Sequence, residues 1–304
     1  MVNHTHTHTH THTHTAKSEP RCATCEYLKS GLRLVYGLIA RVYVYIFGRP
    51  SAQKINNVIL QLALRGRGYN NCCDPKSTGE AIFIDLLAKT NPKLCIDIGA
   101  NKGHYSETLL SKTKANIVAF EPLPKAFDAL LKLKALHPNR FEAVNVGVGQ
   151  KEDTLELFYG TEDSELASFS KEVKQVDYVG ASNVNVMTVP VITLDSYYTR
   201  NLKGRFESLD LLKIDTEGFE YEVLMGAQQT ILELKPKFIQ IEYNWHQLFR
   251  TQSLKKLSEL IVGYSAYQML PYGSGLVKRD LNRPESNIYH YSNFVFVRDD
   301  LSLN

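Results

Sequence analysis

Short apolar runs rich in β-branched residues alternate with longer amphipathic runs from Pro92 to the end of the chain. This alternation is typical of strand–helix–strand units, in which each helix returns the chain to a strand parallel to the previous one. The sequence therefore predicts an α/β fold with a doubly wound, mostly parallel, seven-stranded sheet of the Rossmann-like class. The expected strands are 94–98, 116–120, 141–146, 209–214, 237–243, 264–270 and 293–297, and the expected helices are 106–111, 125–137, 219–232 and 253–262.

The interval 154–194 breaks this alternation, because it holds two strand-like pieces, 155–159 and 185–192, around a polar stretch. An insertion between the third and fourth core strands can cover a substrate, since binding residues are often carried on loops around a rigid scaffold. We therefore expect one domain over 81–304 with an insertion at 154–194. A helical extension over 21–80 and a tail over 1–20 are expected to precede it.

His and Thr alternate from His4 to Thr15 in that tail. The stretch has the composition of an affinity tag or of a native low-complexity tail, and both interpretations remain open. Neither composition builds a core, so the stretch has no part in the predicted fold.

The most apolar stretch of the chain is Leu32–Phe47, which contains Arg33 and Arg41. It is shorter than the roughly 20 residues that a membrane-spanning helix needs, and no small-residue cleavage site follows it. The pattern predicts an amphipathic helix. Two interpretations remain open: packing against protein, including another copy of the chain in a homo-oligomer, or peripheral contact of residues 28–49 with a membrane.

Charge and cysteine content limit the class of protein. The chain has 35 basic and 32 acidic residues, a net charge of +3, which gives no reason to expect a nucleic acid as the main partner. The cysteines are odd in number, which indicates reduced thiols and a cytoplasmic protein. Cys22 and Cys25 form a C-x-x-C pair, but no second pair follows at zinc-ligand spacing. The five cysteines are Cys22, Cys25, Cys72, Cys73 and Cys95.

The segment 94–103, LCIDIGANKG, joins an expected strand to an expected helix through Gly99. Glycine lets the backbone turn sharply and leaves room for a ligand. A dinucleotide fingerprint would have glycine at Asn101, where a pyrophosphate contacts the backbone. Asn101 in place of this glycine favours a ligand that is a nucleoside with an amino-acid tail and without a pyrophosphate. Asp97 could accept the tail's ammonium, and amides near the helix N-terminus at Gly103 could bind its carboxylate.

A second signal lies at Glu121-Pro122, which ends the next expected strand 22 positions after Gly99. A carboxylate at this position can accept both hydroxyls of a ribose. The third strand ends near Gly147 and Val148, where small residues would leave space for an adenine edge. In this order and at this distance, the motifs predict an adenosine site.

More carboxylates follow the later strands, namely Asp215, Glu217 and Glu242. Ligands of parallel sheets gather outside the carboxyl edge, so these residues are expected beside the reacting end of the ligand. Asp215, Glu217, Glu242 and His246 are candidate bases for removing a hydroxyl proton. Asp215, Glu242 and Asn244 could instead present oxygens to a divalent metal, and helix capping could explain one or two of the acids.

Six segments carry a resemblance to a known family. From about Lys93 to Tyr243 the chain resembles the FkbM family of methyltransferases, class I enzymes that use S-adenosylmethionine and are mostly O-methyltransferases of sugars or polyketide-type products. The resemblance implies cofactor contacts at Asp97, Gly99, Asn101, Gly103 and Glu121. It implies a reaction centre at Asp215, Glu217 and Glu242, with Ser168 and Phe169 in the covering segment. The segments are IDIGANKGHYS, AFEPLPKAF, NVGVGQKEDTLELF, SELASFSK, VITLDSY and LLKIDTEGFEYEVLMGA.

The expected function is therefore transfer of a methyl group to a hydroxyl of a saccharide or a similar polar acceptor. Asn244 and Trp245 are expected on the acceptor side with Ser168 and Phe169, although an aromatic residue such as Trp245 can equally belong to the edge of the core. One alternative is a nicotinamide-dependent oxidoreductase, against which Asn101 argues. The other is a non-catalytic nucleoside-binding module, against which the retained carboxylates argue.

Overall fold

The computed structural model describes residues 30–71 and 74–301. It separates the chain into two compact units, 1–59 and 60–304. The His/Thr-rich stretch and the cysteines other than Cys95 lie outside the described residues, and the expected domain boundary at 80 stays a prediction. Cys95 is a buried thiol in the first strand of the larger unit.

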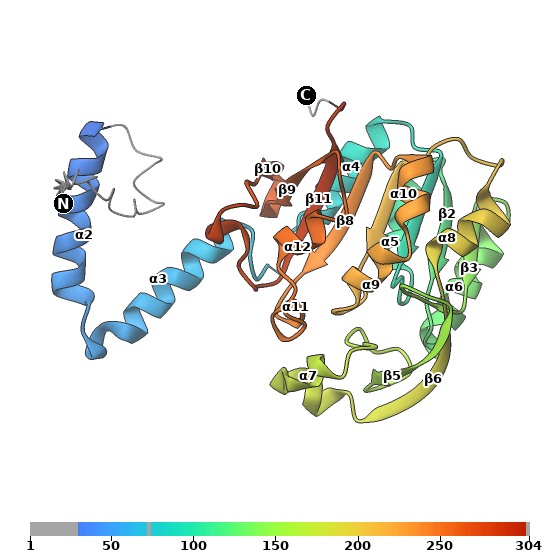
Figure 1. The fold of residues 1–304 in the computed structure, drawn as a ribbon, viewed down its shortest axis with the longest axis horizontal. Helices are drawn as coiled ribbons and strands as arrows, with labels where there is room; N and C mark the ends of the chain where they lie inside the picture. The colour runs from blue at the N-terminus through green and yellow to red at the C-terminus, as the bar shows by residue number, and fades with distance from the viewer. Residues whose placement is uncertain (1–29, 72–73, 302–304) are drawn as a thin grey trace, which may run out of the picture. The chain divides into compact units, whose positions relative to one another are not determined.

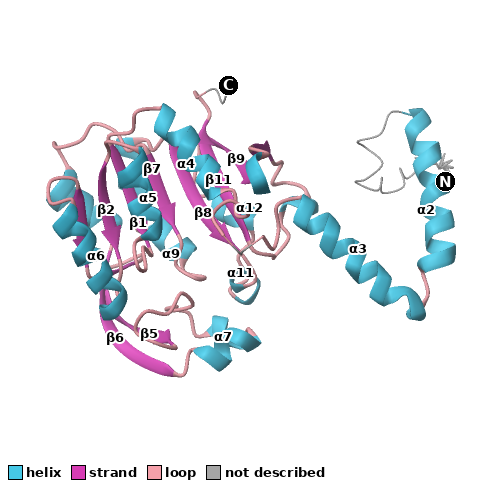
Figure 2. Cartoon of the chain, turned by 180° about the vertical axis from the view of Figure 1, so that it is seen from behind, coloured by secondary structure: helices cyan, strands magenta, loops and turns pink. Residues whose placement is uncertain are grey.

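The larger unit is built on an eight-stranded sheet in the order β10-β9-β11-β8-β7-β1-β2-β3, shown from opposite sides in Figures 1 and 2. β8, β7, β1, β2 and β3 pair in parallel, whereas β11, β9 and β10 are antiparallel. The α/β class is confirmed, and each predicted strand is present with ends within two residues of the expected ones. The strands are β1 (Leu94–Ile98), β2 (Asn116–Phe120), β3 (Phe141–Val144), β7 (Leu211–Ile214), β8 (Phe238–Tyr243), β9 (Tyr264–Met269), β10 (Leu276–Lys278) and β11 (Ser292–Arg298).

The prediction of seven strands was one short, because β10 is a three-residue edge strand. So short a strand shows no period in the sequence. The central strand β1 is buried along its whole length, as a parallel strand between two helical layers must be. Leu94 and Ile96 pack into one apolar cluster, and Cys95 packs into the other on the opposite face.

Two layers of helices cover the sheet. Apolar side chains of α4, α5 and α6 pack in one cluster, and those of α8, α9, α10 and α12 pack in the other. The single helix predicted over 219–232 is two helices, because the chain turns at Gly226, where a Cβ would lie 2.0 Å from the carbonyl oxygen of Gly149. The helices are α4 (Glu80–Lys89), α5 (His104–Lys112), α6 (Pro124–Leu136), α8 (Leu194–Tyr197), α9 (Glu220–Met225), α10 (Gln228–Leu234), α11 (His246–Phe249) and α12 (Leu254–Ser258).

The predicted insertion forms a small sheet of its own, in the order β4-β6-β5. Both strands expected in it are present, and a short helix, α7, lies between them. Figure 1 shows this insertion at one end of the main sheet. The insertion contributes β5 (Asp153–Tyr159), η2 (Glu172–Gln175), α7 (Asp177–Ser182) and β6 (Asn185–Ile192), and β4 (Gly147–Val148), which precedes it, completes the small sheet.

The smaller unit contains α2 (Ser30–Phe47), η1 (Pro50–Ala52) and the beginning of α3 (Gln53–Gly66). The helix predicted over Leu32–Phe47 is therefore present. None of the helices within the described ranges has both the length and the apolar content that crossing a bilayer requires.

Candidate active site

The carboxyl ends of β1 and β2 lie side by side. Ile98 pairs with Phe120, and the amides of Gly99 and Ala100 donate to the Phe120 carbonyl oxygen at 3.1 and 3.0 Å. Gly99 has a φ of +79°, and a Cβ on it would lie 1.7 Å from the carbonyl oxygen of Asp215. Only glycine can therefore hold this bend, which brings the ends of β1, β2 and β7 together.

Glu121 follows β2 and is only 5% exposed. Its Oε2 accepts a hydrogen bond from the Asn101 amide, and its Oε1 accepts one from the Leu123 amide, both at 2.8 Å. Burial raises the pKa of this carboxyl to about 7, although the two amides oppose the shift. The carboxylate is thus held rigidly beside Gly99 at the cost of burying its charge.

A cavity of about 750 Å³ opens at these strand ends. It is lined by residues at the carboxyl ends of β1, β2, β7 and β8 and by residues of the insertion. Most of the expected site residues line it. These are Gly99, Asn101, Glu121, Pro122, Gly147, Val148, Phe169, Asp215, Glu217, Glu242, Asn244 and Trp245.

Four expected site residues do not line the cavity but hold residues that do. Asp97 is fully buried, accepts from Ser106 Oγ at 2.7 Å and lies 3.5 Å from Lys213 Nζ. Gly103 caps the N-terminus of α5 with a φ of +82°. The other two, Ser168 and His246, both contact Glu217: Ser168 Oγ donates to its carbonyl oxygen at 2.7 Å, and His246 Nδ1 lies 2.7 Å from its Oε2.

The carboxylates at the far end of the cavity form a compact cluster. The pairing of Ile214 with Ile241 places Asp215 and Glu242 level with each other, and carboxylate oxygens of these two and of Glu217 lie within 4.8 Å of one another. Burial, followed by the charges of Asp215 and Glu217, raises the pKa of the Glu242 carboxyl well above its ordinary value. The Glu242 carboxyl therefore holds its proton more tightly than an isolated glutamate does.

His246 supports this cluster from behind. Its ring is fully buried. Burial lowers the pKa of His246, but the hydrogen bond and charge of Glu217 outweigh it, so that the pKa is raised. The close contact of its Nδ1 with Oε2 of Glu217 makes His246 a positioning partner of that carboxylate.

Lys213 is a site residue that sequence reasoning missed. Its ammonium is buried beneath the cavity, 3.0 Å from Asp215 Oδ2 and 3.5 Å from Asp97 Oδ1. Burial lowers the pKa of Lys213, but the charges of Asp215 and Asp97 outweigh burial and raise it. The available signal was a lone lysine inside the apolar strand LLKI. A buried cation there offsets part of the negative charge that the strand ends accumulate.

None of the acids after β7 is the N-cap of α9, which is Phe219 and makes no side-chain capping bond; Glu220 instead binds the loop that precedes the helix. Its Oε1 accepts from the amides of Thr216 and Gly218 at 3.0 and 3.1 Å, and its Oε2 accepts from Gln247 at 2.6 Å. Glu220 therefore shapes the loop that carries Glu217, whereas Asp215 and Glu217 themselves face the cavity.

The insertion is fastened to the loops around the cavity. Asn101 Nδ2 donates to the Ser164 carbonyl oxygen at 2.9 Å, and Lys102 pairs with Asp163 at 3.1 Å. On the other side, the rings of Tyr178 and Trp245 meet edge to face with centres 5.5 Å apart. The insertion thus forms part of the cavity wall and contacts the loops on two sides of it, and its role in covering a substrate stays a prediction.

Asp215, Glu217 and Glu242 have the spacing to hold a divalent metal. The third ligand expected from sequence, Asn244, uses its atoms otherwise: Oδ1 accepts from the His246 amide at 2.8 Å, and Nδ2 donates to Glu242 at 2.6 Å. Metal binding by Asp215, Glu242 and Asn244 stays a prediction.

Several methyltransferases are similar to this chain in sequence. A 2-O-methyltransferase, NoeI, from Sinorhizobium fredii (strain NBRC 101917 / NGR234) is 25% identical over 201 residues, which cover 63% of this chain and 79% of NoeI. The hexuronic acid methyltransferase AglP from Haloferax volcanii is 27% identical over 168 residues, 54% of this chain and 62% of AglP. The methyltransferase sdnD from Sordaria araneosa is 30% identical over 166 residues, 48% of this chain and 64% of sdnD. The chain thus spans less than two thirds of the length of the last two.

Among solved structures, an O-methyltransferase from Bacillus cereus in complex with SAH matches with a TM-score of 0.40 and 12% identity, covering 84% of this chain and 96% of that one. A likeness that weak says nothing of activity. The model of the FkbM methyltransferase domain matches residues 97–268, which is more than half of the chain and includes Gly99, Glu121, Asp215 and Glu242. The chain therefore belongs to the FkbM methyltransferase family and is an enzyme that methylates.

Proposed function

We propose that this enzyme transfers the methyl group of S-adenosylmethionine to a hydroxyl of a carbohydrate or a related polar natural product. One observation carries the proposal: a single cavity joins the Gly99 and Glu121 strand ends to the cluster of Asp215, Glu217 and Glu242. Its volume of about 750 Å³ lies within the usual range of small-molecule sites, roughly 300–1,000 Å³.

The residues at the β1 and β2 ends fit the nucleoside half of that cofactor. Each carboxylate oxygen of Glu121 accepts one backbone N–H, and a carboxylate has about four acceptor positions. Both oxygens therefore keep capacity for the two hydroxyls of a ribose. Gly147 and Val148 also line the cavity, and we expect the adenine edge beside them.

When bound, S-adenosylmethionine supplies an electrophilic methyl group on sulfur. The methyl group would pass to the oxygen of the acceptor hydroxyl, and the carboxylate cluster would take up the proton that this hydroxyl loses. Burial and the neighbouring negative charges raise the pKa of Glu242, which favours proton uptake there. Lys213 and His246 keep Asp215 and Glu217 in place while this occurs.

The aromatic pair Trp245 and Tyr178 supports a saccharide as the acceptor. Both rings line the cavity on the side of the cluster, and Trp245 is 40% exposed. Aromatic faces of this kind stack on apolar faces of sugar rings while polar neighbours bind hydroxyls. The names of NoeI and AglP, a 2-O-methyltransferase and a hexuronic acid methyltransferase, point to the same class of acceptor.

Calorimetry with S-adenosylhomocysteine and with NADH tests the cofactor. We expect binding of the first alone, and Glu121→Ala should weaken it by about 1.5–3 kcal/mol, as expected for loss of hydrogen bonds to a charged group. Glu107→Ala, on the exposed side of α5, is the matched control and should bind like the wild type. Failure of the wild type to bind S-adenosylhomocysteine would refute the cofactor assignment.

Mass spectrometry tests the acceptor. The wild type is incubated with S-adenosylmethionine and separate pools of neutral saccharides, hexuronic acids and non-sugar alcohols. We expect saccharide products that are heavier by one methylene, together with release of S-adenosylhomocysteine. Products only in the non-sugar pool would refute the acceptor class while leaving the cofactor assignment intact.

A further inference from the structure

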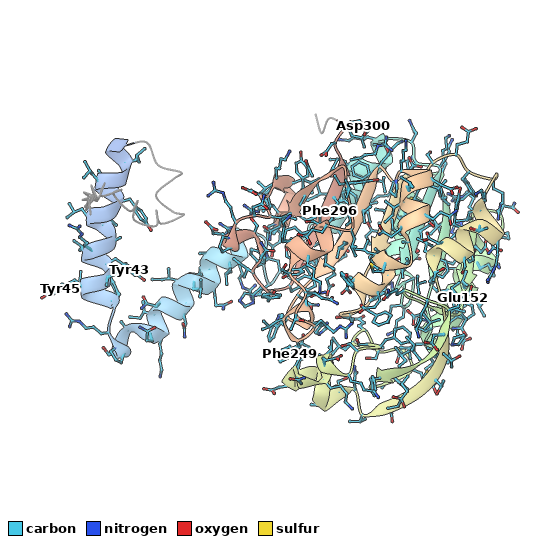
Figure 3. All side chains as sticks on the ribbon, viewed as in Figure 1. Tyr43, Tyr45, Glu152, Phe249, Phe296 and Asp300 are labelled. Carbon is cyan, nitrogen blue, oxygen red and sulfur yellow. The ribbon has the colours of Figure 1, made fainter. Side chains whose placement is uncertain are left out.

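The smaller unit has an unusual share of exposed apolar side chains. On α2, the side chains of Leu34 and Tyr45 are 80% and 78% exposed, and most of the other large apolar residues of this helix are exposed as well. Figure 3 shows Tyr43 and Tyr45 projecting from different sides of this helix. The exposed large apolar residues of α2 are Leu32, Leu34, Val35, Tyr36, Leu38, Ile39, Val42, Tyr43, Val44, Tyr45 and Ile46.

The beginning of α3 continues this apolar surface. Ile55, Val58 and Ile59 are spaced three and one residues apart, which places them on one side of the helix, and all are exposed. Exposed apolar surface of this extent marks a site that another apolar surface covers.

The same unit carries charge of only one sign. No Asp or Glu occurs between Tyr27 and Cys73, whereas residues 30–59 include the cations Arg33, Arg41, Arg49 and Lys54. The whole chain has 35 basic and 32 acidic residues, so the segment departs strongly from the rest. Apolar surface combined with positive charge complements an anionic lipid bilayer.

The corner between the two helices is fixed by polar contacts. Asn56 Nδ2 donates to the Phe47 carbonyl oxygen at 2.9 Å, and Asn56 Oδ1 accepts from Tyr43 at 2.6 Å. The Arg49 guanidinium lies 5.8 Å from the centre of the Tyr45 ring. A cation beside a tyrosine suits the boundary between headgroups and acyl chains, where the ring and the charge each find their preferred surroundings.

Two other occupants fit less well. Crossing the bilayer conflicts with the length and apolar content of the described helices. A second copy of the chain would bring Arg41, Arg49 and Lys54 against the same cations, and the segment has no acid to pair with them. We propose that residues 30–59 dock the enzyme peripherally on an anionic phospholipid bilayer.

Co-sedimentation of the full chain with vesicles tests the proposal. The vesicles contain either phosphatidylcholine alone or phosphatidylcholine with phosphatidylglycerol. We expect preferential binding to the anionic vesicles, which 1 M NaCl weakens because it shortens the screening length to about 3 Å. Equal binding to both vesicles, or none to either, would overturn the proposal.

Two double variants separate the charge from the apolar surface. Each cation near an anionic bilayer strengthens binding about fivefold, so Arg41→Glu with Lys54→Glu should weaken it by about 25-fold or more. Leu38→Glu with Val42→Glu should weaken it on the order of a hundredfold, because two exposed apolar contacts are lost.

Matched controls lie in the larger unit. Lys114→Glu with Lys132→Glu reverses two exposed cations there, and Leu232→Glu with Val262→Glu replaces two exposed apolar residues. Both controls should bind vesicles like the wild type, and all four double variants should keep the wild-type affinity for S-adenosylhomocysteine. Light scattering reports the alternative: a dimer that Leu38→Glu with Val42→Glu dissolves, with no vesicle binding, would assign the surface to a second copy.

Discussion

Cofactor binding should be coupled to the ionisation of Glu121. Burial raises the pKa of this carboxyl to about 7 in the free protein. Ribose hydroxyls donate hydrogen bonds and so favour the ionised carboxylate, which means that only the ionised fraction binds fully. Since a carboxyl loses its charge as the pH falls, we expect cofactor affinity to decrease below pH 7.

The magnitude follows from the ionised fraction. With a pKa of about 7, the fraction falls from about nine tenths at pH 8 to about one tenth at pH 6. The apparent Kd is the intrinsic Kd divided by that fraction, so it should rise about tenfold between these pH values. An ordinary glutamate, with a pKa of about 4.3, would give almost no change over this range.

Calorimetry with 5′-methylthioadenosine measures this effect, because the ligand keeps the ribose and lacks the titrating amino group of the cofactor. Glu121→Gln should bind much more weakly than the wild type at pH 8 and about as well at pH 6. Glu107→Gln, an exposed carboxyl on α5, should follow the wild type throughout. A Kd independent of pH in the wild type would refute the coupling between Glu121 and the ribose.

Four further outcomes test the site. In urea denaturation, Gly99→Ala should lower the free energy of unfolding by about 3 kcal/mol or more. The control Gly204→Ala has a similar φ of +77° but no atom near the added Cβ, and it should lower the free energy of unfolding by about 1–2 kcal/mol. Equal losses would contradict the close approach of Gly99 to the residue that follows β7. Lys213→Met should cost about 3–5 kcal/mol by leaving buried carboxylates without their cation, and adding Asp97→Asn should recover part of that loss. Asp215→Asn should lower turnover about 10²-fold or more with little change in the Kd of S-adenosylhomocysteine, and parallel losses in both would move this residue into the cofactor site. Chelation by EDTA should leave turnover unchanged, since Asn244 already uses its oxygen; recovery of lost activity by Mg²⁺ would show a metal role.

The fold was predictable because its signals are local. Alternation of apolar strands and amphipathic helices appears in any window of the sequence, and strand ends such as those of β1 and β6 were placed to the residue. Contacts between distant segments were not predictable in the same way. The interruption between α9 and α10 at Gly226 depends on the close approach of the Gly149 backbone, which lies far away in the sequence. No local sequence pattern indicates it.

For the candidate site, the sequence predicts which edge of the sheet holds the residues but not which way their side chains face. Topology alone places these residues at one edge of the sheet, because Gly99, Glu121 and Asp215 each follow a parallel strand and Glu242 is the last residue but one of β8. It does not say which side chains face the cavity. Asp97 lies one residue before the end of β1, on the same side of the strand as Cys95, so it lies under the first turn of α5 and accepts a hydrogen bond from Ser106 there.

Buried charge explains why the remaining assignments needed the structure. Three carboxylates near one another and a buried Asp97 would repel strongly without a cation, and Lys213 supplies it from within an apolar strand. The sequence shows the acids, since they stand after the strands, but it does not show that a strand lysine turns toward them. The same holds for His246, whose ring lies behind Glu217 and outside the cavity. Lys213 and His246 thus contact the acids from positions that the strand pattern does not reveal.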